Sequence, residues 1–297
     1  MPRTRPIMPF NIDYQIPIVE REQINSSHHV IPLDSDDPKF NEPMVNLADY
    51  NIAFESYHAI SDGSNAPYFK PIKGSRQEGW LRQTVAEKLL KVNDNLRPFG
   101  AELLIYDAYR SIECQQGLWE FFYERGRSEI PNASEDDCRQ YALGYVRDPR
   151  IFDRQDTRTF PIHITGSSVD VVLKYLDSDE LLDMGSAFEE IIDVSYTDYF
   201  ERQLAEGLIE KDDIRLLNRR LMDWAFTEEG FLNDPILYWH YDWGNQLWIK
   251  VKKALYDSAP EAAWYGHIES PKWGVEDASL LLTEATQNSQ IEPSIEV

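Results

Sequence analysis

The sequence HITGSSVDVVLKY, residues 163–175, places a histidine just before a predicted strand and an aspartate within the first residues of that strand. The β-branched run that follows Asp170 favours a strand, and Gly166 permits a tight turn between His163 and Asp170. In a regular strand Asp170 points away from the face of its two valine neighbours. We therefore expect its carboxylate to open towards a cleft beside His163, while the valines pack inward.

A third candidate ligand lies far along the chain, in Tyr238-Trp239-His240-Tyr241. Two imidazoles and one carboxylate suit Zn²⁺, and three protein ligands leave a fourth position for water, which is typical of a catalytic site. We expect His163, Asp170 and His240 to hold this ion. Arg110 follows a predicted strand, and we expect it to be the nearby electrophile.

The elements around these residues alternate between helix and strand. Apolar residues from Trp80 to Leu96 recur at helical spacing, and Gly100 stands where a left-handed residue would end the helix. Residues 101–106 read as a buried strand, after which Ser111 can cap a helix through about Arg125.

The second half of the chain begins less regularly. Residues 128–159 are polar and predict irregular cover, whereas 169–175 resumes strand character. An amphipathic helix is expected from about Asp213 to Phe226, closed by Gly230, with a final strand pair at 236–250. Short stretches at 45–68 suggest strands or extended loops. Together these elements predict an α+β fold, a single domain with a mainly antiparallel central sheet flanked by helices.

Composition limits the partners. A formal net charge of −23 repels phosphate polymers and anionic membranes, so we expect neither nucleic acid nor membrane binding, and a neutral or cationic small-molecule substrate fits better. Cys114 and Cys138 are too few for a disulfide framework and are expected to be reduced. Without an apolar signal core or a long apolar run, the chain is expected to be cytoplasmic. A homo-oligomer is left open.

The expected organisation has three parts. Residues 1–44 show no sustained periodicity and predict an N-terminal arm that is wrapped over the surface or partly disordered. Residues 45–270 form the predicted domain, and 271–297 form an acidic, polar C-terminal tail. No internal repeat is found.

Four blocks, in this order, resemble the zinc D-Ala-D-Ala dipeptidases of the vancomycin-resistance type. That family shares a fold with D-Ala-D-Ala carboxypeptidases and the hedgehog signalling domain. With the helix at Trp80 the resemblance covers roughly residues 45–250, and its His-x-x-Gly-x-x-x-Asp block followed by Trp-His is specific in combination. The blocks are residues 103–111 (LLIYDAYRS), 163–170 (HITGSSVD), 184–189 (MGSAFE) and 239–248 (WHYDWGNQLW).

The resemblance implies zinc ligands at His163, Asp170 and His240. It also implies that Arg110 stabilises the negatively charged oxygen of a tetrahedral intermediate. Glu189 matches a family aspartate that holds the substrate's ammonium group, so its carboxylate is expected to do the same with one extra methylene.

The family pattern breaks at the catalytic glutamate, which stands three residues before the last histidine. That position is Leu237 here, and leucine can neither accept nor give a proton. Pro161 replaces a serine that family members usually carry two residues before the first histidine. On a regular strand Asp242 shares a face with His240, within reach of a metal-bound water through one further water. Asp234 and Glu229 precede that strand and could fold back, but no sequence pattern directs either of them to the metal.

Three functions remain after this comparison. The first is a zinc dipeptidase acting on D-Ala-D-Ala or a related small dipeptide. The second is a zinc enzyme repurposed for a non-peptidase reaction on an amino-acid-derived substrate, in which Leu237 shapes an apolar pocket. The third is a catalytically silent binding module. The remaining histidines are expected to be ordinary core or surface residues: His28, His29, His58 and His267.

Overall fold

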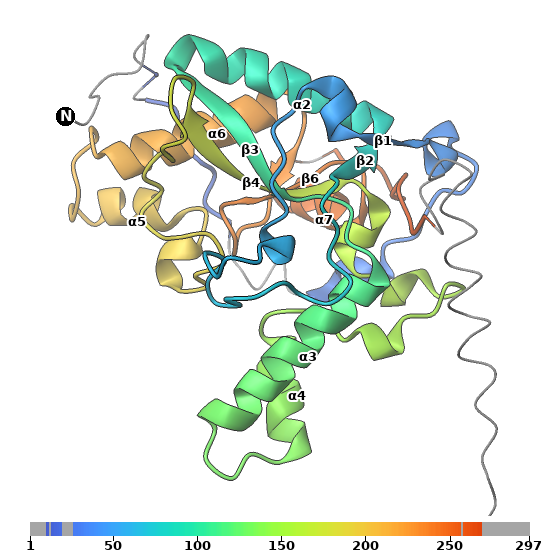
Figure 1. The fold of residues 1–297 in the computed structure, drawn as a ribbon. Coiled ribbons are helices and arrows are strands. Elements are labelled where there is room, and N and C mark those ends of the chain that lie inside the picture. The colour runs from blue at the N-terminus through green and yellow to red at the C-terminus, as the bar shows by residue number, and fades with distance from the viewer. Residues whose placement is uncertain (1–9, 12, 20–25, 257, 269–297) are drawn as a thin grey trace, which may run out of the picture.

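The computed structural model describes residues 10–11, 13–19, 26–256 and 258–268 (Figure 1). The predicted C-terminal tail lies outside them. The strands are β1 (Met44–Asn46), β2 (Trp80–Arg82), β3 (Ala101–Asp107), β4 (Ser168–Tyr175), β5 (Leu232–Asn233) and β6 (His240–Asp242). The helices are α2 (Gln83–Leu96), α3 (Ile112–Glu129), α4 (Glu135–Leu143), α5 (Tyr199–Ala205), α6 (Ile214–Glu228) and α7 (Gln246–Leu255).

The central sheet has the strand order β3-β4-β6-β5, and all of its neighbouring strands are antiparallel. Strand β4 lies in the middle, with Leu173 opposite Leu103 of β3 and Asp170 opposite His240 of β6. The pair β1-β2 forms a separate two-stranded sheet. The predicted α+β class with an antiparallel central sheet is therefore confirmed.

Helices α2 and α6 pack against each other, and α2 also contacts β3 (Figure 1). Their buried faces and the sheet share one apolar core, because apolar side chains recur along each helix at the helical period. Helices α3 and α4 pack together as a pair that projects from the body of the molecule in this view. Fully buried members of the core include Leu81, Leu89, Leu103, Val171, Phe226 and Tyr241.

Several predicted boundaries hold and others are wrong. Gly100, Gly166 and Gly230 all adopt the left-handed backbone expected of them, with φ between 67° and 81°. The first helix was placed too early, because Trp80–Arg82 pairs with β1 and α2 begins only at Gln83.

The predicted irregular cover at 128–159 contains helix α4, which the sequence prediction missed. Its start is fixed by a capping box: Ser134 Oγ accepts from the Asp137 amide, and the Asp137 carboxylate accepts from the Ser134 amide. Only Cys138 and Ala142 of this helix are buried, so its apolar periodicity is weak.

The predicted strand pair at 236–250 is also wrong in its second half. Strand β6 is only three residues long, and helix α7 follows it. Gly244, with φ 73°, turns the chain, and the Asn245 side chain then accepts a hydrogen bond from the Trp248 amide at 3.0 Å. This N-cap starts a helix in a sequence whose alternating apolar residues had suggested a strand.

The described residues of the N-terminal arm are tied to the body by polar contacts. The Tyr14 hydroxyl donates to Asp223 Oδ2 at 2.7 Å, and the Ile16 amide donates to Glu201 Oε1 at 3.0 Å. Further along, the Gln246 side chain donates to the carbonyl oxygen of Ile31 at 2.5 Å. These partners lie about two hundred residues later in the sequence, so the arm closes over elements from the end of the domain.

Both cysteines are buried and free. Within the described residues, no helix combines the length and the apolar character that a bilayer span requires.

Leu103 tests the central packing, because its side chain is fully buried between sheet and helices. We expect Leu103→Ala to lower the free energy of unfolding by about 2–5 kcal/mol, the usual cost of removing a buried leucine side chain. Chemical denaturation of both proteins measures the difference. The control is Leu208→Ala, because Leu208 is 63% exposed, and an equal loss in both variants would contradict the assignment of the core.

Asp223, which accepts the hydrogen bond from Tyr14 of the arm, makes the stability of the fold depend on pH. Burial raises the pKa of this carboxyl to about 6, against the hydrogen bond from Tyr14, which lowers it. Between about pH 4 and pH 6 Asp223 is therefore protonated in the folded protein but ionised in the unfolded chain. Its contribution to the free energy of unfolding is highest below about pH 4 and falls as the pH rises through about 6. We expect Asp223→Asn to stabilise the protein by about 1–3 kcal/mol at pH 8 and by nothing below pH 4.

Denaturation of the variant and the wild type across this pH range provides the measurement. The control is the exposed Asp212. We expect the effect of Asp212→Asn on the free energy of unfolding to be the same at every pH. A gain for Asp223→Asn that is the same at pH 4 and pH 8 would show that the buried carboxyl does not titrate as described.

Candidate metal centre and cavity

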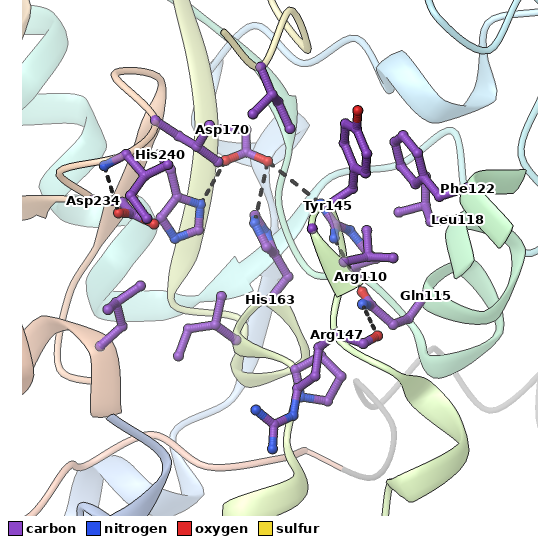
Figure 2. Close-up of a pocket in the computed structure, with 18 of the residues that line it drawn as sticks. Arg110, Gln115, Leu118, Phe122, Tyr145, Arg147, His163, Asp170, Asp234 and His240 are labelled. Atoms are coloured by element: carbon purple, nitrogen blue, oxygen red, sulfur yellow. Dashed lines mark hydrogen bonds and ion pairs between the residues drawn. The ribbon is translucent and has the colours of Figure 1, made fainter. Parts of the chain in front are cut away.

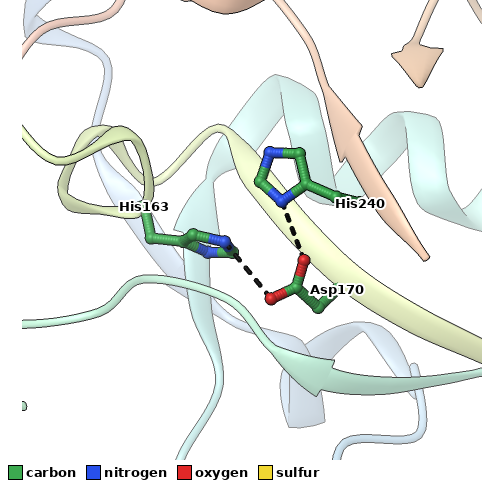
Figure 3. Close-up of side chains that lie close together, drawn as sticks. All are labelled: His163, Asp170 and His240. Atoms are coloured by element: carbon green, nitrogen blue, oxygen red, sulfur yellow. Dashed lines mark hydrogen bonds and ion pairs between the residues drawn. The ribbon is translucent and has the colours of Figure 1, made fainter. Parts of the chain in front are cut away.

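Three side chains from separate parts of the chain meet at one point (Figure 3). His163 lies on the short 3₁₀ helix Ile162–Thr165, Asp170 on β4 and His240 at the start of β6. Their ligand atoms all lie within 4.8 Å of one another, and all three residues are buried. His163 Nε2 is 3.3 Å from Asp170 Oδ2, and His240 Nδ1 is 2.8 Å from Asp170 Oδ1. Two nitrogens and a carboxylate oxygen at such spacing suit a zinc ion.

Both imidazoles are oriented by a second partner. His163 Nδ1 donates to the carbonyl oxygen of Ala108 at 2.9 Å, which leaves Nε2 with its lone pair facing Asp170. His240 contacts Asp242 Oδ2 through Nε2 at 3.0 Å, which leaves Nδ1 on the side of Asp170. Outer hydrogen bonds of this kind fix the ring orientation of metal-binding histidines.

Asp242 is itself held firmly. Its Oδ1 accepts from Ser168 Oγ at 2.5 Å and from the Asn245 side-chain amide at 2.7 Å. The expectation that Asp242 shares a face with His240 is confirmed, and the contact with the ring engages the carboxylate. The position therefore suits support of the histidine better than proton transfer to a substrate.

Arg110 lies between β3 and the N-cap of α3, where the sequence placed it. Its guanidinium donates to Asp107 Oδ2 from Nε at 2.7 Å, and its Nη2 lies 2.5 Å from the same oxygen. Nη2 also lies 3.6 Å from Asp170 Oδ2, and Nη1 donates to Gln115 Oε1 at 3.2 Å. Arg110 is thus fixed beside the ligand cluster by a carboxylate that the sequence prediction did not single out.

The charges of this cluster shift one another's equilibria. Burial alone would raise the pKa of Asp170, but His163 and His240 outweigh it and hold that pKa well below its usual range. Burial would lower the pKa of His240, yet Asp242 and Asp170 raise it well above its usual value. Asp107 and Asp170 likewise raise the pKa of Arg110 against its burial.

Glu189 adopts a left-handed backbone, with φ 63°, and its carboxylate points into the same region. Its Oε1 lies 3.5 Å from His58 Nε2, and His58 Nδ1 lies 3.7 Å from Asp107 Oδ2. Burial and the nearby Glu189 raise the pKa of Tyr68 well above its usual value. His58, expected to be an ordinary core or surface histidine, is a core residue with 2% exposure, and it lies between the carboxylates of Glu189 and Asp107.

A cavity of about 420 Å³ opens beside the three candidate ligands (Figure 2). Arg110, Glu189, Leu237 and Pro161 all line it, so the structure brings every predicted site residue to one cavity. Much of the remaining wall is apolar, including Leu118, Phe122, Val146, Ile162, Trp239 and Leu247.

A scan against protein families matches residues 78–260 to the peptidase M15 family, described as D-Ala-D-Ala dipeptidase. This match spans more than half of the chain. The chain belongs to the D-Ala-D-Ala dipeptidase family. The resemblance drawn from the four sequence blocks is thereby confirmed, and the family is one of hydrolytic peptidases.

Individual members of the family show moderate identity. A D-alanyl-D-alanine dipeptidase of Synechocystis sp. is 26% identical over 179 residues, which cover 57% of this chain and 70% of that protein. A D-alanyl-D-alanine dipeptidase of Enterococcus faecium is 28% identical over 163 residues, which cover 53% of this chain and 69% of that protein. Among solved structures, the vancomycin-resistance D,D-pentapeptidase VanY in complex with Zn(II) matches with 14% identity and a TM-score of 0.35, covering 78% of this chain and 96% of that one.

The two carboxylates that precede β6 in the sequence, Asp234 and Glu229, lie in different places. Asp234 lines the cavity near His240, and its Oδ1 accepts from the Ile236 amide at 2.9 Å (Figure 2). Glu229 caps the end of α6 and is not part of the cavity lining. The folded chain therefore places Asp234 in the cavity wall, although no sequence pattern directs it there.

Other residues of the cavity escaped the sequence prediction. Asp107 stands three residues before Arg110, so its spacing could have suggested the ion pair. Arg147 and His29 also line the cavity, but they lie in segments that the sequence described only as irregular cover or arm. No local signal directs them there.

Proposed function

We propose that the protein is a zinc-dependent, D-Ala-D-Ala dipeptidase-like hydrolase that acts on a small dipeptide or a related amino-acid derivative. The observation that supports this most directly is the convergence of His163, Asp170 and His240, with each ring oriented by a second hydrogen bond. Family membership supports hydrolysis as the reaction class.

His163, Asp170 and His240 would hold the ion. When bound, zinc would polarise a substrate carbonyl and lower the pKa of water. Arg110, fixed by Asp107 and Gln115, offers a positive charge beside the ligand cluster, where negative charge develops during attack on a carbonyl. Its fixed geometry means that little reorganisation is needed when that charge appears.

Glu189 would bind the substrate's ammonium group. Glu189 lines the cavity, and its Oε1 lies 3.5 Å from Nε2 of the buried His58. A carboxylate in a partly buried pocket stabilises a cation strongly, because the surrounding dielectric is low. The substrate class that follows carries a free amine near the reacting carbonyl.

Leu237 favours a second candidate. Its side chain lines the cavity at the position of the family's proton carrier, and a leucine provides only apolar surface there. A zinc enzyme repurposed for a non-peptidase reaction on an amino-acid-derived substrate would also fit this wall. The two candidates differ in whether free amino acids are released.

The outer support of the metal centre gives one test. We expect Asp242→Ala to weaken zinc binding by about 10–100-fold, because His240 loses the partner that orients its ring. Competition with a chelator of known affinity measures the change. Asp179→Ala removes an exposed carboxylate and serves as the control, and equal zinc affinity in both variants would contradict the proposed role of Asp242.

The reaction itself is tested with a panel of dipeptides, including D-Ala-D-Ala, and the zinc-loaded protein. We expect Leu237→Glu to raise the release of free amino acids by about 10²–10⁴-fold over the wild type, because it restores a proton carrier beside the metal. Leu237→Gln is the matched control, since it has a similar size but cannot transfer a proton at neutral pH.

Two outcomes count against the peptidase. If Leu237→Glu is no faster than Leu237→Gln, the cavity has changed more widely than at one residue, and the repurposed enzyme is favoured. If neither the wild type nor Leu237→Glu releases amino acids from any dipeptide, the dipeptidase is excluded.

A further inference from the structure

A second arginine besides Arg110 lines the cavity. Arg147 lines the cavity and is half-buried, and Figure 2 shows it on the His163 side of the ligand cluster. The segment that carries it follows α4, and Gln115 of α3 donates to its carbonyl oxygen at 3.0 Å. Arg147 therefore has a fixed backbone position next to the groups that surround Arg110.

The Arg147 side chain is positioned without a carboxylate. Nε donates to the Thr159 carbonyl oxygen at 3.2 Å, and Nη2 donates to the Arg158 carbonyl oxygen. Nη1 contacts Nε2 of His29, from the arm. Burial, together with His28 and Arg147, lowers the pKa of His29 to about 3, so this ring is neutral and accepts the hydrogen bond. A guanidinium has more N–H donors than these contacts use.

The neighbouring acids are engaged elsewhere. Asp156 acts on Arg147 electrostatically, but its carboxylate is bound by Arg158 at 2.7 and 2.8 Å. Among the described residues that line the cavity, Arg110 is paired with Asp107 and Asp170, whereas Arg147 makes no ion pair with a carboxylate. A half-buried guanidinium with free N–H donors and no ion-paired carboxylate can donate them to a carboxylate of a ligand.

We propose that Arg147 binds the carboxylate of the substrate, so that the cavity selects amino-acid derivatives with a free acid group. This inference rests on the proposed function, because it places the substrate in the cavity between two anchors. Glu189 takes the amine and Arg147 takes the acid, while the apolar wall between them accepts the body of the molecule.

The overall charge of the protein opposes the binding of an acid. The protein has a formal net charge of −23, so its general field attracts cationic groups and repels a carboxylate. Preference for an acid over its amide would therefore run against the general field and would need a specific positive group.

The test compares two ligand pairs, D-Ala-D-Ala and D-Ala-D-Phe, each as the free acid and as the C-terminal amide. Calorimetric titration of the zinc-loaded full chain gives the affinities at fixed salt. We expect the wild type to bind at least one acid about 10–100-fold more tightly than its amide, the usual range for a charge-assisted hydrogen bond. Arg147→Gln should reduce that ratio to about one, and Arg147→Lys should retain part of it.

Arg150→Gln is the matched control, because it removes a guanidinium three residues away that is 49% exposed and bound to Asp148. It should keep the wild-type ratio. An unchanged ratio in Arg147→Gln, or a wild type without preference for either acid, would overturn the proposal. A general loss of structure would weaken acid and amide binding equally, and that result also counts against it.

The outcomes separate this proposal from the peptidase activity. Acid preference that depends on Arg147 without release of amino acids would sustain the carboxylate site and exclude the peptidase. Release of amino acids without acid preference would sustain the peptidase and exclude the carboxylate site. Binding of neither ligand pair would overturn both.

Discussion

The site depends on the register between β4 and β6, which places Asp170 directly opposite His240. In that register one carboxylate meets two imidazoles, at 2.8 and 3.3 Å. A slip of one residue would turn Asp170 to the opposite face of the sheet, because side chains alternate along a strand. The valines and leucine around Asp170 are almost wholly buried, so the apolar core fixes the register that the polar site requires.

The site also shows how buried charge is balanced. Asp107, Asp170 and Asp242 are all buried, and each is matched by Arg110, a histidine or hydrogen-bond donors. Unmatched charges would be costly in this environment. Leu237 adds no further negative charge to this balance. An acidic side chain does remain in the cavity at Asp234, at a place that the spacing of the family motif does not mark.

The sequence alone predicted those features that depend on short local patterns. Strand β4, the left-handed turn at Gly100 and the cluster of His163, Asp170 and His240 all follow from short patterns that the structure reproduces. Helices α4 and α7 did not, because α4 buries only two side chains, and the start of α7 depends on Asn245, which also binds Ser167, Ser168 and Asp242. The cavity wall at Arg147 was equally hidden, since long-range contacts place it there.

Part of the cavity wall comes from the N-terminal arm. His28 and His29 belong to its wall, yet they precede residue 78, where the match to the family begins. During synthesis the arm leaves the ribosome well before its anchors at Asp223 and Gln246 are made. This side of the wall can therefore be completed only after those later residues have been added to the chain, and it is built from residues that lie outside the segment matched to the family.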